Sequence, residues 1–527
     1  MNHTCVIVAL ISLLLPTAIA LGQEGCAADA NGDGVVNGSD LAMVLGGWGP
    51  CAGCPADLNA NGQVNGEDLA VVLTRWGSTC APTVSSMSAT AGPLAGGTAV
   101  TITGAHLLNP TSVTFGGTPA AITLSLRNSL TVVAPPRREG AATVTVITAG
   151  GAATAGVFTY FGAPTITAVT PNTGAAAGGS TVTITGTAFY GSPIVAFGGV
   201  TASGMSVLSP TQSRAVAPPG VADSTVAISV ATPSGATTLR DAFAYFPIIV
   251  PPWATLLEAL PDPSIVTSEP LRNALTATGF PWRVRDNASG IEMLLVPPGS
   301  FDMGCIQGSN SYGCYGFEQP VHTVTLTNAF YIGRYEVTQA QWQAKMGSNP
   351  SRYQGQADSP SRPVEQVSWN TIQGFLTATG MQLPTEAQWE YACRAGTTTP
   401  FHSGPGFPNG TTDDNLVSQI AWYYYNNCES GSCRPRAVGT KAANALGVHD
   451  VLGNVWEWCN DWGSGYAAAA QENPTGPATG TYRVHRGGGW SNASKLYNTD
   501  RVRSSARQFG PPSGAWPFIG FRVARNP

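Results

Sequence analysis

The stretch Asn444–Trp458 reads NALGVHDVLGNVWEW, and it lies in the region of the chain that decides the fold. Glycines beside tryptophan-rich strands mark bends and close approaches of the backbone. Upstream, Leu383–Gly396 reads LPTEAQWEYACRAG, in which Thr385 can cap a short helix that carries Glu386 in its first turn. Most of the 13 Trp residues also lie beyond residue 280. These features predict an α+β domain over residues 285–527, with short helices and much ordered loop.

Further motifs follow one another along this domain. They are MLLVPPGSFDMG at 293–304, EQPVHTV at 318–324, FYIGRYEVTQAQW at 330–342, PVEQVSW at 363–369, RGGGW at 486–490 and GFRV at 520–523. In this order they resemble the sulfatase-modifying-factor family, whose founding activity is that of the formylglycine-generating enzyme. The resemblance implies a variant of the C-type-lectin fold.

The same resemblance implies a structural calcium site within the opening stretch. Asp450 and Glu457 would supply side-chain oxygens to the ion. Gly453 and Val455 would supply backbone carbonyls, and a set of ligands made only of oxygen suits calcium. A Trp-Glu-Trp turn that is simply packed in the core is the alternative.

The family's oxidase activity implies two cysteines, five residues apart, that hold copper(I) after a Gly-Gly-Ser-aromatic turn. Here the turn is Gly487–Trp490, and Gly489 replaces the serine. The cysteine positions fall on Asn492 and Tyr497, and no cysteine follows Cys459. Because copper(I) requires soft thiolate ligands, we expect neither a copper cofactor nor catalytic residues of this kind.

Three functions therefore compete for the domain. The preferred one is a non-catalytic module that presents a loop surface, including Gly489–Gly514, to a protein or a polysaccharide. The alternatives are a protein-modifying oxidase of the formylglycine-generating type and another enzyme that uses the same cleft. The mature histidines form no spaced pair such as HExxH. Four arginines could line an anion pocket, although salt bridges are favoured, and they are Arg501, Arg503, Arg507 and Arg522.

Two segments near the N-terminus repeat with a spacing of 28 residues, beginning at Asp29 and Asp57. Each has oxygen-bearing side chains at positions 1, 3, 5, 9 and 12, a glycine at position 6 and a backbone carbonyl at position 7, as a hard cation requires. The predicted calcium ligands are Asp29, Asn31, Asp33, Val35, Asn37 and Asp40, then Asp57, Asn59, Asn61, Gln63, Asn65 and Asp68. The apolar stretch after each loop predicts a helix that begins at the carboxylate of position 12. A solvated cluster of Asx-rich turns is the alternative.

The repeated segments resemble the duplicated loop-helix unit of dockerin domains over about residues 26–80. The resemblance implies attachment of residues 21–81 to a cohesin-like or cell-surface partner. Each copy is flanked by cysteines, Cys26 and Cys51 around the first and Cys54 and Cys80 around the second. This flanking departs from the usual cellulosomal form.

Residues 82–161 and 162–246 are similar to one another. AGGTAVTITG at 95–104 matches AGGSTVTITG at 177–186, and FTYF at 158–161 matches FAYF at 243–246. Short Val/Thr/Ile runs between Gly/Pro turns predict strands. The pair resembles tandem IPT/TIG immunoglobulin-like β-sandwiches, for which we expect a spacing role. Residues 247–284 are expected to be a linker with one short helix at 268–278.

Residues 1–20 predict a signal peptide, because an apolar run precedes the small-x-small site Ala18–Ala20. We therefore expect an extracellular or cell-surface protein. No later segment reaches about 18 uninterrupted apolar residues, so no membrane span is expected. A net charge of −5 with no basic patch argues against nucleic acid as a partner.

Ten cysteines remain once the signal peptide is removed, an even number that suits disulfides in an oxidising compartment. In the C-terminal domain the spacing suggests two pairs and two leftover residues. These are Cys305 with Cys314, Cys428 with Cys433, and Cys393 and Cys459, either paired or free.

Overall fold

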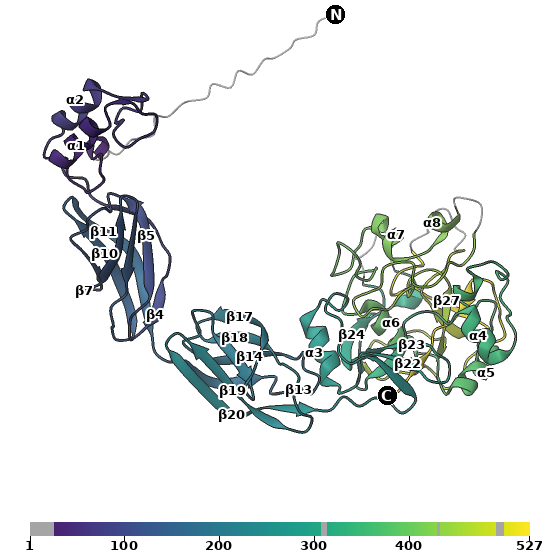
Figure 1. The fold of residues 1–527 in the computed structure, drawn as a ribbon. Helices are drawn as coiled ribbons and strands as arrows, with labels where there is room; N and C mark the ends of the chain where they lie inside the picture. The colour runs from purple at the N-terminus through teal and green to yellow at the C-terminus, as the bar shows by residue number, and fades with distance from the viewer. Residues whose placement is uncertain (1–25, 307–313, 429–432, 492–499) are drawn as a thin grey trace, which may run out of the picture.

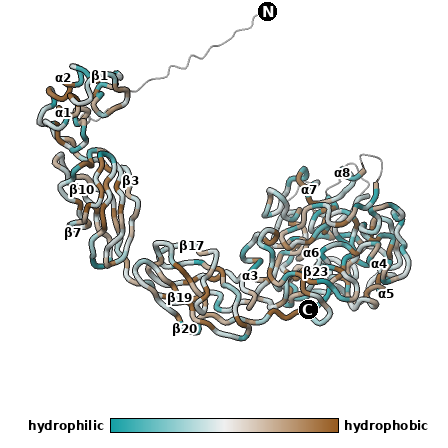
Figure 2. The backbone as a smooth tube through the Cα atoms, viewed as in Figure 1, coloured by the Kyte–Doolittle hydropathy of each residue, from teal (hydrophilic) through white to brown (hydrophobic). Residues whose placement is uncertain are grey.

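The computed structural model describes residues 26–306, 314–428, 433–491 and 500–527, which form four modules that follow one another along the chain (Figure 1). Each module has a buried apolar cluster of its own. The strands of the two central modules carry hydrophobic stretches, drawn in brown, between paler ones (Figure 2). The expected signal peptide, residues 1–20, lies outside the described residues.

The first module contains the two repeated loops. Its elements are η1 (Cys26–Ala28), α1 (Gly38–Gly46), β1 (Gly49–Pro50), β2 (Gln63–Val64) and α2 (Gly66–Thr74). The sequence predicted that each helix begins at position 12 of its loop, and this prediction is wrong. Asn37 and Asn65, at position 9, are the N-caps, and the carboxylates of Asp40 and Asp68 bond back to the cap backbone. Position 12 therefore lies in the first helical turn, where a carboxylate favours the helix N-terminus.

The two sandwiches have the same strand order. In the first, one sheet runs β3 (Thr83–Met87), β5 (Ala99–Ala105), β9 (Ser129–Val133), β8 (Ala121–Leu126), and the other runs β4 (Ala91–Pro93), β11 (Gly151–Phe161), β10 (Gly140–Thr148), β6 (Ser112–Phe115), β7 (Thr118–Pro119). In the second, the sheets are β12 (Thr165–Thr170), β14 (Thr181–Thr187), β18 (Gln212–Val216), β17 (Ser203–Ser209) and β13 (Thr173–Ala175), β20 (Gly235–Phe246), β19 (Thr225–Thr232), β15 (Ile194–Phe197), β16 (Val200–Thr201). The predicted internal repeat is thus a repeat of topology.

Aromatic residues at matching positions fill both sandwich cores. Phe158 contacts Phe115 edge to face with ring centroids 5.2 Å apart, and Phe243 contacts Phe197 in the same way at 5.1 Å. Edge-to-face contacts of this kind stabilise beyond the area that they bury. Alternate residues of the two closing motifs, Phe158 and Tyr160 in the first and Phe243 and Tyr245 in the second, are therefore core residues.

The C-terminal module is an α+β domain with three small sheets. One runs β21 (Ala254–Glu258), β22 (Arg283–Asp286), β23 (Glu292–Val296), β26 (Phe330–Gly333), β32 (Ala524–Arg525); the second runs β24 (Gly299–Met303), β25 (His322–Leu326), β28 (Gln471–Glu472). The third runs β30 (Arg507–Gly510), β29 (Arg483–Arg486), β27 (Trp456–Trp462), β31 (Ile519–Gly520). Its short helices are α3 (Glu269–Ala277), η2 (Gly316–Glu318), α4 (Gln339–Met346), η3 (Ser359–Ser361), α5 (Trp369–Thr379), α6 (Glu386–Arg394), η4 (Asp414–Leu416), α7 (Val417–Ile420) and α8 (Tyr424–Cys428).

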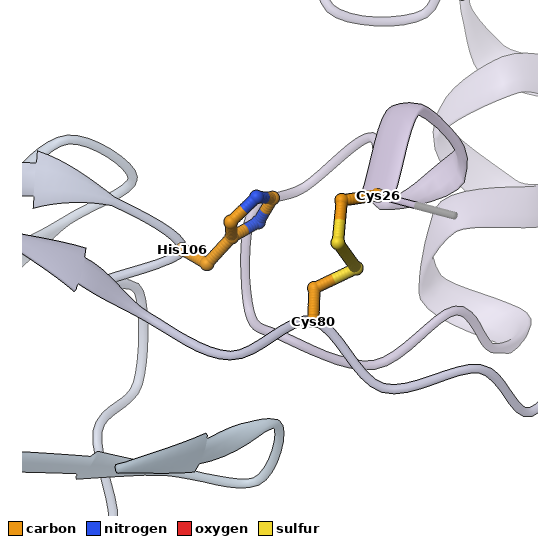
Figure 3. Close-up of side chains that lie close together, drawn as sticks. All are labelled: Cys26, Cys80 and His106. Carbon is orange, nitrogen blue, oxygen red and sulfur yellow. A yellow bond between two sulfur atoms is a disulfide. The ribbon is translucent and has the colours of Figure 1, made fainter. Parts of the chain in front are cut away.

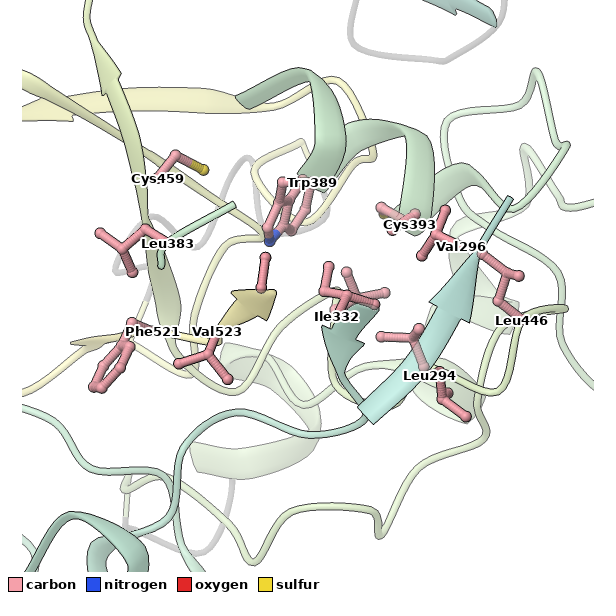
Figure 4. Packing of buried hydrophobic residues seen from close by; sticks show 14 of the residues in the cluster. Leu294, Val296, Ile332, Leu383, Trp389, Cys393, Leu446, Cys459, Phe521 and Val523 are labelled. Carbon is pink, nitrogen blue, oxygen red and sulfur yellow. The ribbon is translucent and has the colours of Figure 1, made fainter. Parts of the chain in front are cut away.

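Helix α6 lies at the centre of this domain. Thr385 caps it as predicted, with its side chain accepting from the backbone of Gln388. Trp389 of α6 projects among buried residues of β23, β26 and β27, including Ile332 (Figure 4). The helix therefore joins the sheets to the Trp-rich strand that the opening motif forms.

Residues 247–284 differ from the expected linker. Strand β21 pairs with β22, and Val266, Leu275 and Trp282 are buried in the C-terminal core. The predicted helix is present as α3, capped by Ser268. Backbone pairing and apolar burial thus make most of this segment part of the C-terminal domain.

Within the described part of the chain, no helix combines the length and apolar character needed to cross a bilayer. Four disulfides occur in it, Cys26–Cys80, Cys51–Cys54, Cys305–Cys314 and Cys428–Cys433. The two C-terminal pairs are those suggested by spacing. The N-terminal pairs do not enclose one loop copy each. The Cys26–Cys80 disulfide joins the two ends of the first module. Disulfides and immunoglobulin-like modules are compatible with an extracellular protein.

Candidate functional site

The first calcium-loop candidate is organised around the carboxylate of Asp29. Its Oδ1 accepts hydrogen bonds from the backbone of Gly32 at 2.8 Å and Asp33 at 3.1 Å, and its Oδ2 accepts from Gly34 at 2.9 Å. Gly34 has φ +92°, which the sharp turn at position 6 requires. Burial opposes ionisation of Asp29, but the hydrogen bonds from His106 and Gly34 outweigh it and lower the carboxyl's pKa.

The second loop repeats this arrangement. Oδ2 of Asp57 accepts from the backbone of Gly62 at 2.8 Å, and Oδ1 accepts from Asn61 at 3.0 Å. Burial opposes ionisation of Asp68 too, and backbone donors led by Asn65 outweigh it, so the pKa of Asp68 is lowered. Each loop closes on itself, since the backbone amides of Asn31 and Asn59, at position 3, donate to the carboxylates of Asp40 and Asp68, at position 12, at 3.1 and 3.2 Å. The donors at the six predicted positions of each loop are oxygens throughout, which fits calcium.

A third cluster of carboxyl groups lies at the opening motif of the C-terminal domain. Glu457, on β27, accepts from Trp389 Nε1 at 2.6 Å and from Arg522 at 2.7 and 2.6 Å. Asp450, with φ +53°, accepts from the backbone of Gly439 at 2.6 Å through Oδ2. Its Oδ1 is buried and has no hydrogen-bond partner among the described residues. Burial raises the pKa of Asp450 to about 6.

Sequence reasoning missed one member of this cluster, Glu336. It accepts from Asn454 Nδ2 at 2.6 Å and from the backbone of Val455 at 3.0 Å. Burial, and then the carboxyls of Asp450 and Glu457, raise its pKa well above the usual range. The only signal in the sequence was the place of Glu336 within the FYIGRYEVTQAQW motif.

Three buried carboxyl groups therefore share one guanidinium, that of Arg522. A buried negative charge needs a compensating positive charge or a proton. The unpartnered Oδ1 of Asp450 and the excess of carboxylates fit a divalent cation at this place. Gly453 and Val455 lie between Asp450 and Glu457 in the same turn, where the resemblance requires carbonyl ligands.

The turn that carries the family's pocket serine is Gly487–Trp490. A Cβ on Gly488 would lie 2.5 Å from the carbonyl oxygen of Arg501, so this position requires glycine. At Gly489 a Cβ would lie 3.2 Å from Cδ1 of Trp456, and glycine leaves no hydroxyl there. Asn492 and Tyr497, at the cysteine positions, lie outside the described residues.

The two cysteines without a disulfide are far from the requirements of a copper ligand. Cys393 and Cys459 are both fully buried. Burial raises the pKa of Cys393 to about 12 and that of Cys459 well above its ordinary value. Metal ligation and nucleophilic chemistry need the thiolate, which burial disfavours at both positions.

The arginines of the C-terminal motifs are paired with carboxylates. Arg503 bonds Glu318 at 2.9 Å, and Arg507 bonds Glu386 at 2.6 Å. With Arg522 on Glu457, three of the four predicted arginines form buried salt bridges, as favoured from the sequence. They therefore have structural partners.

Comparisons with known proteins agree with this architecture. The model described as the sulfatase-modifying factor enzyme 1-like domain matches residues 282–527, and the IPT/TIG domain model matches residues 82–160 and 164–245. These matches define a class of modular proteins in which immunoglobulin-like sandwiches precede a formylglycine-generating-enzyme-like domain. The chain belongs to the sulfatase-modifying-factor family through that domain.

Individual relatives align with the C-terminal part of the chain. The formylglycine-generating enzyme of Thermomonospora curvata is 35% identical over 195 residues, 36% of this chain and 62% of that protein. The chaperone protein LppX of Paenibacillus barcinonensis is 31% identical over 255 residues, 38% of this chain and 82% of that protein. Among solved structures, PvdO from Pseudomonas aeruginosa is 26% identical with a TM-score of 0.36, covering 46% of this chain and 98% of the other. The chain thus spans less than two thirds of the first of these relatives.

Proposed function

We propose that this is an exported, calcium-stabilised binding protein whose C-terminal domain lacks the oxidase activity of formylglycine-generating enzymes. In this proposal the N-terminal loops bind calcium and attach the chain to a cohesin-like or cell-surface partner. The sandwiches are spacers, and the C-terminal domain binds a polysaccharide or a protein.

The loss of the copper ligands carries the proposal. No cysteine follows Cys459, and the pocket serine is replaced by Gly489. Cys393 and Cys459 are the thiols left outside disulfides among the described residues, and both are buried. Asn and Tyr side chains at positions 492 and 497 do not replace a pair of thiolates for copper(I). A relative named as a chaperone also supports a binding role on this fold.

A groove on the C-terminal domain supports a neutral ligand. It measures about 790 Å³ and is lined by amide side chains, among them Gln382, Gln388, Asn460 and Asn473, beside the ring of Phe280. None of the lining side chains is ionisable. Amides with a nearby aromatic face suit the hydroxyl groups and apolar faces of a neutral sugar. The groove lies outside the loop surface Gly489–Gly514 that the sequence suggested.

The oxidase alternative is tested by incubating the purified full chain with a Cys-x-Pro-x-Arg peptide, copper(I) and oxygen. We expect no aldehyde by mass spectrometry, whereas a formylglycine-generating enzyme assayed in parallel converts the peptide. Conversion above the enzyme-free control would refute the proposal.

The binding role is tested on a glycan array with and without EDTA. A neutral glycan that binds the wild type should lose affinity when Asn460 in the groove is changed to Ala. Asn370→Ala, at an exposed position outside the groove, is the matched control. Equal binding by both variants would place the ligand elsewhere.

A further inference from the structure

The first calcium loop is held by the neighbouring sandwich. His106, which follows β5, lies with Nδ1 2.8 Å from Oδ2 of Asp29. Arg127, in the turn between β8 and β9, donates to the carbonyl of Ala30 at 2.8 Å and to that of Asp29 at 3.3 Å. The backbone of Leu108 donates to the carbonyl of Gly32 at 3.2 Å. Loops of the sandwich therefore contact both the side chain and the backbone of the first predicted ligand.

A disulfide adjoins this contact. His106 points towards the Cys26–Cys80 disulfide, which joins the ends of the calcium module (Figure 3). The ring nitrogen and the two sulfurs lie within 4.8 Å of one another. Because the sulfurs are bonded to each other, they are not thiolate ligands for a metal. The histidine's polar partner is the loop carboxylate.

The second loop has no equivalent contact in the described structure. A Cβ on Gly32 would lie 2.2 Å from Cγ of Arg127, whereas the matching position of the second loop is Ala60, which is exposed. At Gly62 a Cβ would meet nothing within 4 Å, but at Gly34 it would lie 3.2 Å from the backbone of Gly150. The two loops thus differ where the sandwich touches one of them.

Comparison with the second sandwich shows that the sandwich fold does not need the side chains of His106 and Arg127. The backbone of Leu107 donates to the carbonyl of Arg127, and at the same place Phe189 donates to Pro210. His106 corresponds to Ala188, and the two share a left-handed backbone, with φ +56° and +59°. The sandwich that does not adjoin a calcium loop thus has Ala and Pro where the first has His and Arg.

We propose that His106 and Arg127 are positioning residues for calcium in the first loop, so that calcium binding and docking of this loop on the first sandwich reinforce each other. The inference rests on the proposed calcium binding and adds a division of roles. The first loop is a junction site bound within the chain, and the second loop is the one open to an outside partner.

The physical basis is the orientation of one carboxylate. Oδ2 of Asp29 is bonded to the backbone of Gly34 and to His106, at 2.9 and 2.8 Å, and Oδ1 accepts from the backbone of Gly32 and Asp33, at 2.8 and 3.1 Å, so the carboxylate is fixed in one orientation. Residues that orient a metal ligand commonly change metal affinity by about 10- to 100-fold. Because coupling between two binding events is reciprocal, calcium should also tighten the junction.

The test is calorimetric titration of the decalcified full chain with CaCl2 at constant pH, one loop at a time. Asp57→Asn with Asp68→Asn disables the second loop, and Asp29→Asn with Asp40→Asn disables the first. When the second loop is disabled, so that only the first loop binds, His106→Ala and Arg127→Ala should each weaken calcium binding by about tenfold or more. When the first loop is disabled, the same two substitutions should not change the calcium affinity of the second loop. Ala188 shows that alanine fits this backbone, so loss of folding is not expected from His106→Ala.

Hydrogen exchange of the full chain gives the second readout. Calcium should slow exchange in peptides that contain Leu108, whose amide crosses the junction, and leave the equivalent segment at Phe189 unchanged. Disabling the first loop should abolish this protection, and disabling the second should not.

The outcomes separate the two proposals. If neither loop binds calcium, the proposed calcium role and this inference both fail. If both loops bind but His106→Ala and Arg127→Ala leave the first loop's affinity and the exchange at Leu108 unchanged, the division of roles alone is overturned.

Discussion

Replacing Glu365 by Gln should remove a large part of the pH dependence of the C-terminal domain's stability. The side chain is fully buried; one oxygen accepts from the backbone of Tyr353 at 2.8 Å, and Oε2 has no partner among the described residues. Burial raises the pKa of Glu365 from the ordinary carboxyl value of 4.5 to about 7. The folded state therefore holds a proton that the unfolded chain has already released between these pH values.

This difference in bound protons determines whether the free energy of unfolding rises or falls with pH. Stability from the protonated Glu365 is fully present below about pH 4.5 and is lost as pH rises through 7. A shift of this size corresponds to at most about 3 kcal/mol, since one pKa unit is about 1.4 kcal/mol. Gln keeps the acceptor for Tyr353 and carries no charge, so it should match the wild type near pH 4.5 and exceed it by about 3 kcal/mol at pH 8.

Denaturant unfolding of the full chain, followed by tryptophan fluorescence, measures this because most Trp residues belong to the C-terminal domain. Glu472→Gln, on strand β28, is the control and should run parallel to the wild type from pH 4.5 to 8. Parallel profiles for Glu365→Gln and the wild type would refute the account of Glu365 as a buried, proton-holding carboxyl group.

Three other perturbations have expected outcomes. Arg486→Met removes one of the two guanidinium groups that pair with the buried Glu390. It should lower the free energy of unfolding, measured with denaturant, by about 3–5 kcal/mol. Gly488→Ala should destabilise far more than Gly290→Ala; both have positive φ, +76° and +71°, but a Cβ at 488 meets backbone and one at 290 meets open space. Calcium should raise the melting temperature of the tryptophan-monitored transition, and Asp450→Asn should reduce that increase; an equal increase in the variant would exclude Asp450 as a ligand.

Local signals were readable from the sequence. The cap at Thr385 and the disulfide Cys305–Cys314 depend on residues a few positions apart, so spacing alone predicts them. The repeated sandwiches were recognisable because alternation and turn glycines recur in both copies. The predicted helix starts were wrong by a few residues, because Asn37 is the N-cap and Asp40, at the third helical position, completes a capping box with it.

Long-range features were not readable in this way. Four clustered cysteines allow three connectivities, and the observed pairs include Cys26–Cys80 across the whole module. The segment before residue 285 joins the C-terminal domain through the pairing of β21 with β22 and the burial of Val266, Leu275 and Trp282, which are contacts that form only after folding. Glu336 gains its significance from Asn454 and Asp450, which are distant in sequence and meet it only after folding.

Because the two sandwiches have the same strand order, the same loop of each one contacts the module that precedes it in the chain. The loop after β14 of the second sandwich touches the end of the first through Tyr190, whose hydroxyl donates to the carbonyl of Phe161 at 3.3 Å. The same loop of the first sandwich, with His106, contacts Asp29 of the N-terminal module instead. A gene duplication that inserted another copy of the second sandwich would lengthen the series of modules and leave the contact between the N-terminal module and the first sandwich intact. Exchanging the order of the two would break that contact, since the second sandwich has Ala188 and Pro210 at the places of His106 and Arg127.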